Sequence, residues 1–280
     1  MELSPVMSEL RPHSLTTLQE HGINCSLECF SCKQQATSLL ANAAVHADIK
    51  IVTDGTTGIQ FVEKTFGRKR EVPGSYVSEL AADYETMFTD YERIGIDHLA
   101  SNYNLQTTFQ GENAELTVEQ LYFPEGTALD WMIKGDRIPE VINSIATNCL
   151  IPVLSATDDR IYDDQSWVFL DASLKNFAVL DDDEEIKTFY LDFWVPRVRN
   201  ESGEIKTYPD FHPHKISEDE IRQRFFSKRG ILQNFIRKSV SDLNDHQDSL
   251  TDFKRAISTE LKVQLDTFFP GMTLDDIVTN

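Results

Sequence analysis

The sequence predicts a protein of the α+β class, in which strands and helices occupy separate parts of the chain. Most of the short β-rich runs lie in residues 46–123, around one long amphipathic helix, whereas residues 124–280 are mainly helical with one small hairpin. Segregated strands and helices are typical of α+β folds, because a doubly wound sheet needs strands and helices that alternate along the chain. No internal repeat interrupts this order.

The first of these parts contains four β-rich runs and one helical pattern. An Asp-Gly sequence at residues 54–55 separates the first two runs, which indicates a hairpin. From Tyr76 to about Ile94 apolar residues recur at the spacing of a helix, and Ser75 just before them is the expected N-cap. The four predicted strands are 48–53, 59–66, 105–110 and 115–123.

The rest of the chain is assigned from turn residues and apolar periodicity. Residues 1–45 should form an arm that ends in a short Ala/Leu-rich helix. We expect an apolar helix from Pro139 to about Leu154, interrupted at Pro152, and a buried strand at 167–170. The remaining predicted elements are a hairpin at 177–180 and 186–191 and helices at 217–228, 230–243 and 248–268.

Composition bounds the partners and the location of the protein. The 280 residues include 26 Lys and Arg against 46 Asp and Glu, a net charge of −20. A chain this acidic repels phosphate backbones, so no nucleic-acid partner is expected. Its acidity suits cationic substrates and divalent metals, but it is also typical of a solvated acidic surface. No run approaches the roughly 20 apolar residues of a membrane helix, and residues 1–11 lack the apolar stretch of a secretory signal. We therefore expect a soluble cytoplasmic protein with no membrane partner, and the sequence leaves its oligomeric state open.

Three polar residues in the second part of the chain point to chemistry. Asp171 and Asn176 lie five positions apart between two apolar runs, and Asp192 follows sixteen positions later at the end of the predicted hairpin. Side chains at the exits of adjacent short strands can converge on one point, and their oxygens suit Mg²⁺ held jointly with nucleotide phosphates. One carboxylate can stay off the metal and orient an acceptor hydroxyl for in-line attack.

This spacing resembles the catalytic loop Asp-x-x-x-x-Asn and the later metal-binding aspartate of protein kinases. It is most similar to the small-molecule kinases of the aminoglycoside phosphotransferase type. The resemblance implies a two-lobed kinase-like fold, with a β-rich N-lobe at 46–123 that includes the long helix. A mainly helical C-lobe at 124–280 would contain the catalytic-loop-like segment 167–194.

The resemblance also assigns roles to the three polar residues. Asp171 matches the catalytic base, and Asn176 and Asp192 match the ligands of Mg²⁺ bound with ATP or another nucleoside triphosphate. We therefore expect ATP- and Mg²⁺-dependent phosphoryl transfer to a hydroxyl of a small molecule. The alternative is a non-catalytic kinase-like nucleotide-binding or scaffold protein, because Phe169 and Leu170 stand where the family has His-Arg or His-Gly.

The nucleotide-binding residues of the first part follow from the same resemblance. Lys64, on the second predicted strand, is the best match to the phosphate-binding lysine, and its partner is either Glu79 or Glu85 in the long helix. Gly55 and Gly58 stand in for the Gly-x-Gly-x-x-Gly loop that covers the phosphates, a motif that this sequence lacks.

A separate cluster of thiols near the N-terminus supports a third function. Cys25, Cys29 and Cys32 are spaced C-x₃-C-x₂-C, which resembles the cluster loop of radical S-adenosylmethionine enzymes. Thiolates are the ligands of a [4Fe–4S] cluster, so a radical S-adenosylmethionine or other iron–sulfur protein is a further alternative. A zinc clip completed by His21 or His46 and reduced thiols without a metal are the other interpretations of the same residues.

Overall fold

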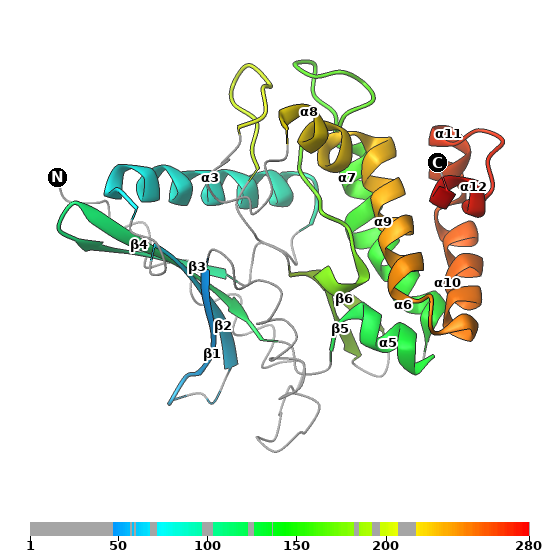
Figure 1. Cartoon of the computed structure of the whole chain (residues 1–280), viewed down its shortest axis with the longest axis horizontal. Coiled ribbons are helices and arrows are strands. Elements are labelled where there is room, and N and C mark those ends of the chain that lie inside the picture. Colours follow the sequence, from blue (N-terminus) through cyan, green and yellow to red (C-terminus); the bar gives the residue numbers. More distant parts are fainter. Residues whose placement is uncertain are drawn as a thin grey trace.

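The computed structural model of the chain describes residues 47–56, 58, 60–67, 72–96, 103–122, 126–135, 137–181, 185–191, 197–206 and 217–279. Within these residues it confirms the predicted α+β class, because strands form a small antiparallel sheet and a separate hairpin while helices dominate the later part of the chain (Figure 1). The predicted N-terminal arm and helix, the three clustered cysteines and Asp192 lie outside the described residues.

The sheet consists of four antiparallel strands in the order β1-β2-β4-β3. All four predicted strands are confirmed, with ends shifted by no more than two residues. They are β1 (Ala47–Thr53), β2 (Gln60–Phe66), β3 (Tyr103–Gln110) and β4 (Asn113–Leu121). In the β1–β2 turn the Gly58 N–H donates to the Asp54 carbonyl at 2.8 Å, and Gly58 has φ +72°, which glycine adopts without strain.

The long helix α3 (Gly74–Arg93) lies along the sheet and packs against β3 and β4 (Figure 1). Its apolar face is buried as the helical spacing predicted. The predicted N-cap at Ser75 is wrong, because the helix already begins at Gly74 and Pro73 is the cap residue. Pro73 forms a β-bridge with Asn113, and the Gly74 N–H donates to the Glu112 carbonyl at 2.8 Å, so contacts with the sheet define the start of the helix.

The other helices form the second part of the molecule. The first is α5 (Ala128–Lys134), whose N-terminus is closed by a capping box between Thr127 and Asp130. The predicted helix 248–268 is divided at Leu261, where φ and ψ are −112° and 18°. The remaining helices are α6 (Ile138–Ile145), α7 (Ile151–Ser155), α8 (Glu218–Ile221), α9 (Lys228–Asp242), α10 (Gln247–Glu260), α11 (Lys262–Phe268) and α12 (Leu274–Thr279).

The interruption predicted at Pro152 is wrong, because a π-helical turn at Ala146–Leu150 joins α6 to α7. The Ile151 N–H donates to the carbonyl of Ala146, five residues back, so the turn is wider than an α-helical one. This widened turn directly precedes Pro152, whose ring would otherwise collide with the carbonyl four residues before it. The helical run 138–155 has the length and composition that could span a membrane, and 56% of it is buried inside the structure.

The strand predicted at 167–170 is also wrong, although the segment is buried. The Trp167 N–H donates to the Ala156 carbonyl at 2.8 Å, and the Leu170 N–H donates to the Phe225 carbonyl at 3.1 Å. The backbone therefore bonds to the ends of helices and not to a neighbouring strand. The predicted hairpin after it is confirmed as β5 (Phe177–Asp181) paired with β6 (Ile186–Tyr190).

One hydrophobic core connects the sheet with the helices of the second part. It contains Phe66 from β2, Tyr84 from α3, Phe177 from β5, Phe235 from α9 and Phe253 from α10, all without exposed surface. Burying aromatic side chains of this size stabilises a fold by roughly 1.5–3 kcal/mol each. The packing therefore fixes α3 and the sheet against β5, β6 and the later helices.

Candidate functional site

The loop that follows the buried segment 167–170 brings Asp171 and Asn176 together. Residues Leu174–Asn176 form one 3₁₀ turn that leads into β5. The Asn176 Nδ2 donates to the main-chain carbonyl of Asp171 at 2.8 Å. This bond closes the loop and orients the amide, with Nδ2 toward the loop backbone and Oδ1, the atom that a cation would bind, at the opposite end.

Lys64 reaches the same place from the sheet. Its Nζ donates to the carbonyl of Leu191 at 3.4 Å, and Leu191 is the residue directly before Asp192. The Leu191 N–H in turn donates to the Asn176 carbonyl at 2.7 Å. A chain of contacts thus runs from Lys64 through Leu191 to Asn176 and Asp171, across segments that are far apart in the sequence.

The carboxylate of Asp171 is bound by two residues of α9 that the sequence analysis did not identify. Lys238 Nζ lies 2.6 Å from Oδ1 of Asp171, and the Asn234 Nδ2 donates to the same oxygen at 3.0 Å. Within the described residues, no bond is made to Oδ2. Lys238 and Asn234 lie one helical turn apart on the predicted helix 230–243, but nothing in their spacing indicated that this face meets Asp171.

Two tyrosines from other elements brace the backbone at Phe169 and Asp171. The Tyr190 hydroxyl accepts from the Asp171 N–H at 3.1 Å and lies 3.3 Å from the Asp171 carbonyl. The Tyr91 hydroxyl, from α3, donates to the Phe169 carbonyl at 2.9 Å. Both rings are fully buried, so these bonds are shielded from water.

The loop and α9 line an open pocket of about 340 Å³. A second ion pair crosses it, because Lys175 Nζ lies 2.5 Å from Oδ1 of Asp242. The two ion pairs balance each other in charge, so the pocket has a polar lining without a strong excess of either sign. It is lined by Asp171, Ser173, Lys175, Asn176, Lys238, Ser241 and Asp242.

A comparison of the sequence with models of known protein families gives no match, and no curated protein matches it. Its function has to be inferred from the geometry of the site.

The two glutamates predicted to partner Lys64 lie on the exposed side of α3. Glu79 forms an ion pair with Lys206 at 2.7 Å, and Lys206 also contacts the buried Asp83 at 2.7 Å. Burial lowers the pKa of Lys206, but hydrogen bonds to Asp83 and Glu79 outweigh this and raise the pKa above its usual value. A bond between Lys64 and either glutamate stays a prediction.

The glycines predicted to cover the phosphates lie in the β1–β2 turn. In the part of the chain that the structure describes, nothing comes within 4 Å of a Cβ built on Gly55 or Gly58. Gly58 and Lys64 are six positions apart, which corresponds to roughly 20 Å when the chain between them is extended. The structure therefore does not bring the two glycines to Lys64, and their contact with a nucleotide stays a prediction.

The donor set at the site can be tested against the expected Mg²⁺. Within the described residues, no group of three or more His, Cys, Asp or Glu side chains could hold a metal ion. The principal predicted ligand, Asp192, is not among them. The ammonium group of Lys238 already contacts Oδ1 of Asp171, so this carboxylate is poorly suited to bind a second cation. Of the two residues predicted to hold the metal, the structure describes only Asn176, so the magnesium site stays a prediction.

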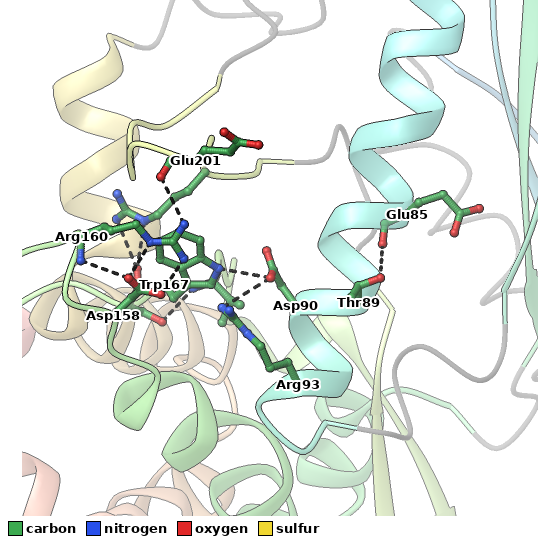
Figure 2. A network of polar contacts seen from close by, with 11 residues as sticks. Glu85, Thr89, Asp90, Arg93, Asp158, Arg160, Trp167 and Glu201 are labelled. Atoms are coloured by element: carbon green, nitrogen blue, oxygen red, sulfur yellow. Dashed lines mark hydrogen bonds and ion pairs between the residues drawn. The ribbon is translucent and has the colours of Figure 1, made fainter.

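The last turn of α3 is fixed to the second part of the molecule by Trp167 (Figure 2). The Trp167 Nε1–H donates to Oδ1 of Asp90 at 3.1 Å, and the guanidinium groups of Arg93 and Arg160 lie 5.2 and 4.3 Å from the indole centroid. Arg160 is held in place by Asp158 at 2.8 Å. Burial raises the pKa of Asp90, and the hydrogen bond from Trp167 opposes this shift.

Proposed function

We propose that the protein is an ATP- and Mg²⁺-dependent phosphotransferase with a two-lobed kinase-like arrangement, acting on a hydroxyl of a small molecule. The sheet with α3 would be the N-lobe, and β5, β6 and the later helices the C-lobe. The order of elements supports this proposal, because a hairpin, a long helix and two strands precede the helical part and the Asp171 loop.

One observation carries the proposal. The predicted phosphate-binding lysine, Lys64, touches Leu191, beside the predicted metal ligand Asp192, and Leu191 is bonded to Asn176. Lys64 is 127 residues from Leu191, so no local pattern produces this contact. The contacts of Lys64, Leu191 and Asn176 support the proposal, because the catalysis of phosphoryl transfer consists mainly of positioning and charge stabilisation.

The residues would divide the work as follows. Bound Mg²⁺, held by Asn176 and Asp192, would withdraw charge from the phosphate oxygens, and Lys64 would hold the phosphates from the side of the sheet. The acceptor oxygen forms a bond to the γ-phosphorus while the bond from that phosphorus to the β,γ-bridging oxygen breaks. Asp171 takes the hydroxyl proton on Oδ2, and the nucleoside diphosphate leaves.

The acidic surface of the chain supports a cationic acceptor, since the net charge of −20 attracts cations. The pocket itself adds no preference, because its two lysines offset its two aspartates. Acceptor selection would then come from hydrogen bonds to its serines and from the shape of the lining.

The first experiment is a thermal-shift titration with Mg-ATP. A ligand at 100 times its dissociation constant stabilises a protein by about 2.7 kcal/mol, so a clear rise in the melting temperature is expected. Asp192→Asn should remove most of this rise, because it deletes the main metal ligand. Asp266→Asn is the matched control, since it makes the same change at an exposed position on α11.

An unchanged melting temperature of the wild type over the whole Mg-ATP range would reject the nucleotide site. A rise without phosphorylation of any hydroxylated compound, and without ATP hydrolysis, would support the non-catalytic alternative.

A further inference from the structure

Among the described residues, the bonds to the Asp171 carboxylate all reach one of its two oxygens. Both Lys238 Nζ, at 2.6 Å, and Asn234 Nδ2, at 3.0 Å, bind Oδ1. Two donors on one oxygen fix the rotation of the carboxylate, so that Oδ2 is directed to a defined place. The Asp171 side chain keeps 21% of its surface exposed, and both it and Lys238 line the 340 Å³ pocket.

The loop and α9 are also held in register by a reciprocal pair of charges. Asp171 binds Lys238, and Lys175, four residues later in the loop, binds Asp242, four residues later in the helix. Because each element contributes one acid and one base, sliding the loop along α9 would place like charges opposite each other. This pairing fixes the position of Asp171 along the axis of α9.

We infer that Lys238 is a positioning residue for Asp171. Lys238 sets the direction of the carboxylate that takes the proton from the hydroxyl of the substrate. This inference rests on the proposed phosphotransferase function. Lys238 acts through Asp171: it restrains one oxygen and leaves the other for the substrate. Asn234 supports it from the preceding turn of the same helix.

The test compares Lys238→Met with Lys254→Met in the full chain. Lys254 is a close match, because it lies 2.6 Å from Oδ1 of Asp275 and its side chain is 33% exposed, the same fraction as Lys238. Mg-ATP affinity is measured by calorimetry, and turnover is measured as ATP consumption, with water as the acceptor when no hydroxylated compound is supplied. Displacing a catalytic group by about 1 Å can lower turnover roughly 10²-fold, and this is the expected effect of Lys238→Met.

The expected results separate positioning from general stability. Lys238→Met should lower kcat with little change in the KM for ATP or in the calorimetric affinity, and Lys238→Arg should recover part of kcat. Lys254→Met should leave kcat unchanged. In the Asp171→Asn background, Lys238→Met should cause no further loss, because a residue that acts through Asp171 has nothing left to position.

Each other outcome is decisive. If Lys238→Met lowers kcat by the same factor with and without Asp171, it acts independently and the inference is wrong. The inference also fails, with the proposed function intact, if the wild type binds and consumes ATP and Lys238→Met does so equally well. If the wild type neither binds nor consumes ATP, the proposed function itself is rejected.

Discussion

The loop from Asp171 to Asn176 and the segment before it are held by residues from three other elements, whereas the described bonds of the β1–β2 turn lie within the turn itself. Tyr190 of β6, together with Lys238 and Asn234 of α9, binds Asp171, and Tyr91 of α3 holds the segment before it. In the turn, the described bonds join Asp54 to Thr56 and Gly58. Side chains that are held by packed, distant elements keep a more precise geometry than a turn that is held by its own bonds.

The largest effect that would sharpen this comparison is expected at Asp171. Asp171→Asn keeps the size and most of the bonds of the side chain but removes the proposed proton acceptor, so turnover should fall about 10²–10⁴-fold. Nucleotide affinity should change little, because the interaction is made chiefly in the transition state. Calorimetry and ATP consumption, measured on the same preparation, give the two quantities.

The role assigned to Asp171 would be wrong if this variant lost nucleotide affinity as severely as Asp192→Asn. Asp171 would then be a metal ligand or a structural residue.

The next effect concerns the brace beneath the loop. Tyr190→Phe removes a buried hydroxyl that contacts both the N–H and the carbonyl of Asp171, and the free energy of unfolding should fall by about 1–3 kcal/mol. Tyr162→Phe is the control, since Tyr162 is 74% exposed and its hydroxyl stays in water. Urea unfolding of the two variants measures the difference, and equal stabilities would show that the brace contributes nothing.

The smallest effects are expected in the β1–β2 turn. Gly58→Ala should destabilise the protein by about 1 kcal/mol, because Gly58 has φ +72° and a side chain is strained there. Gly55→Ala should leave stability almost unchanged, since a Cβ at that position meets nothing within 4 Å. Thermal unfolding checks both values.

The Gly55→Ala variant also tests the role predicted for the turn. If the turn covers the phosphates, the added methyl group should weaken Mg-ATP binding although stability is kept. Unchanged affinity would separate the turn from the nucleotide site and strengthen the contrast with the Asp171 loop.

The parts of the fold that follow from local patterns could be predicted from the sequence. The four strands, the hairpin β5–β6 and the buried face of α3 depend on residues a few positions apart, and all are present. The segment 167–170 could be recognised as buried but not as irregular, because its bonding partner Phe225 lies more than fifty residues away. The helix across Pro152 likewise depends on a π turn for which the sequence has no simple signal.

The candidate site divides in the same way. The spacing of Asp171 and Asn176 identified a loop that the structure closes with a hydrogen bond. Lys238 and Asn234 could not be assigned, because they are 67 and 63 residues from Asp171 and meet it only through the packing of α9. The bond between Lys206 and Glu79 was missed for the same reason.

The contacts that attach α3 limit how far the helix can tilt relative to the second part of the molecule. The last turn of α3 is fixed by Trp167 and Phe169, which contact Asp90, Tyr91 and Arg93. Any tilt of the helix would therefore have its axis at this turn. A helix of 20 residues is about 30 Å long, so a tilt of about 10° at its last turn would move the far end by about 5 Å. Lys206 restrains the helix nearer that far end, because it forms ion pairs with Glu79 and Asp83 at once. With Lys206 bonded and the shared core intact, α3 and the strands packed on it keep their position relative to the Asp171 loop.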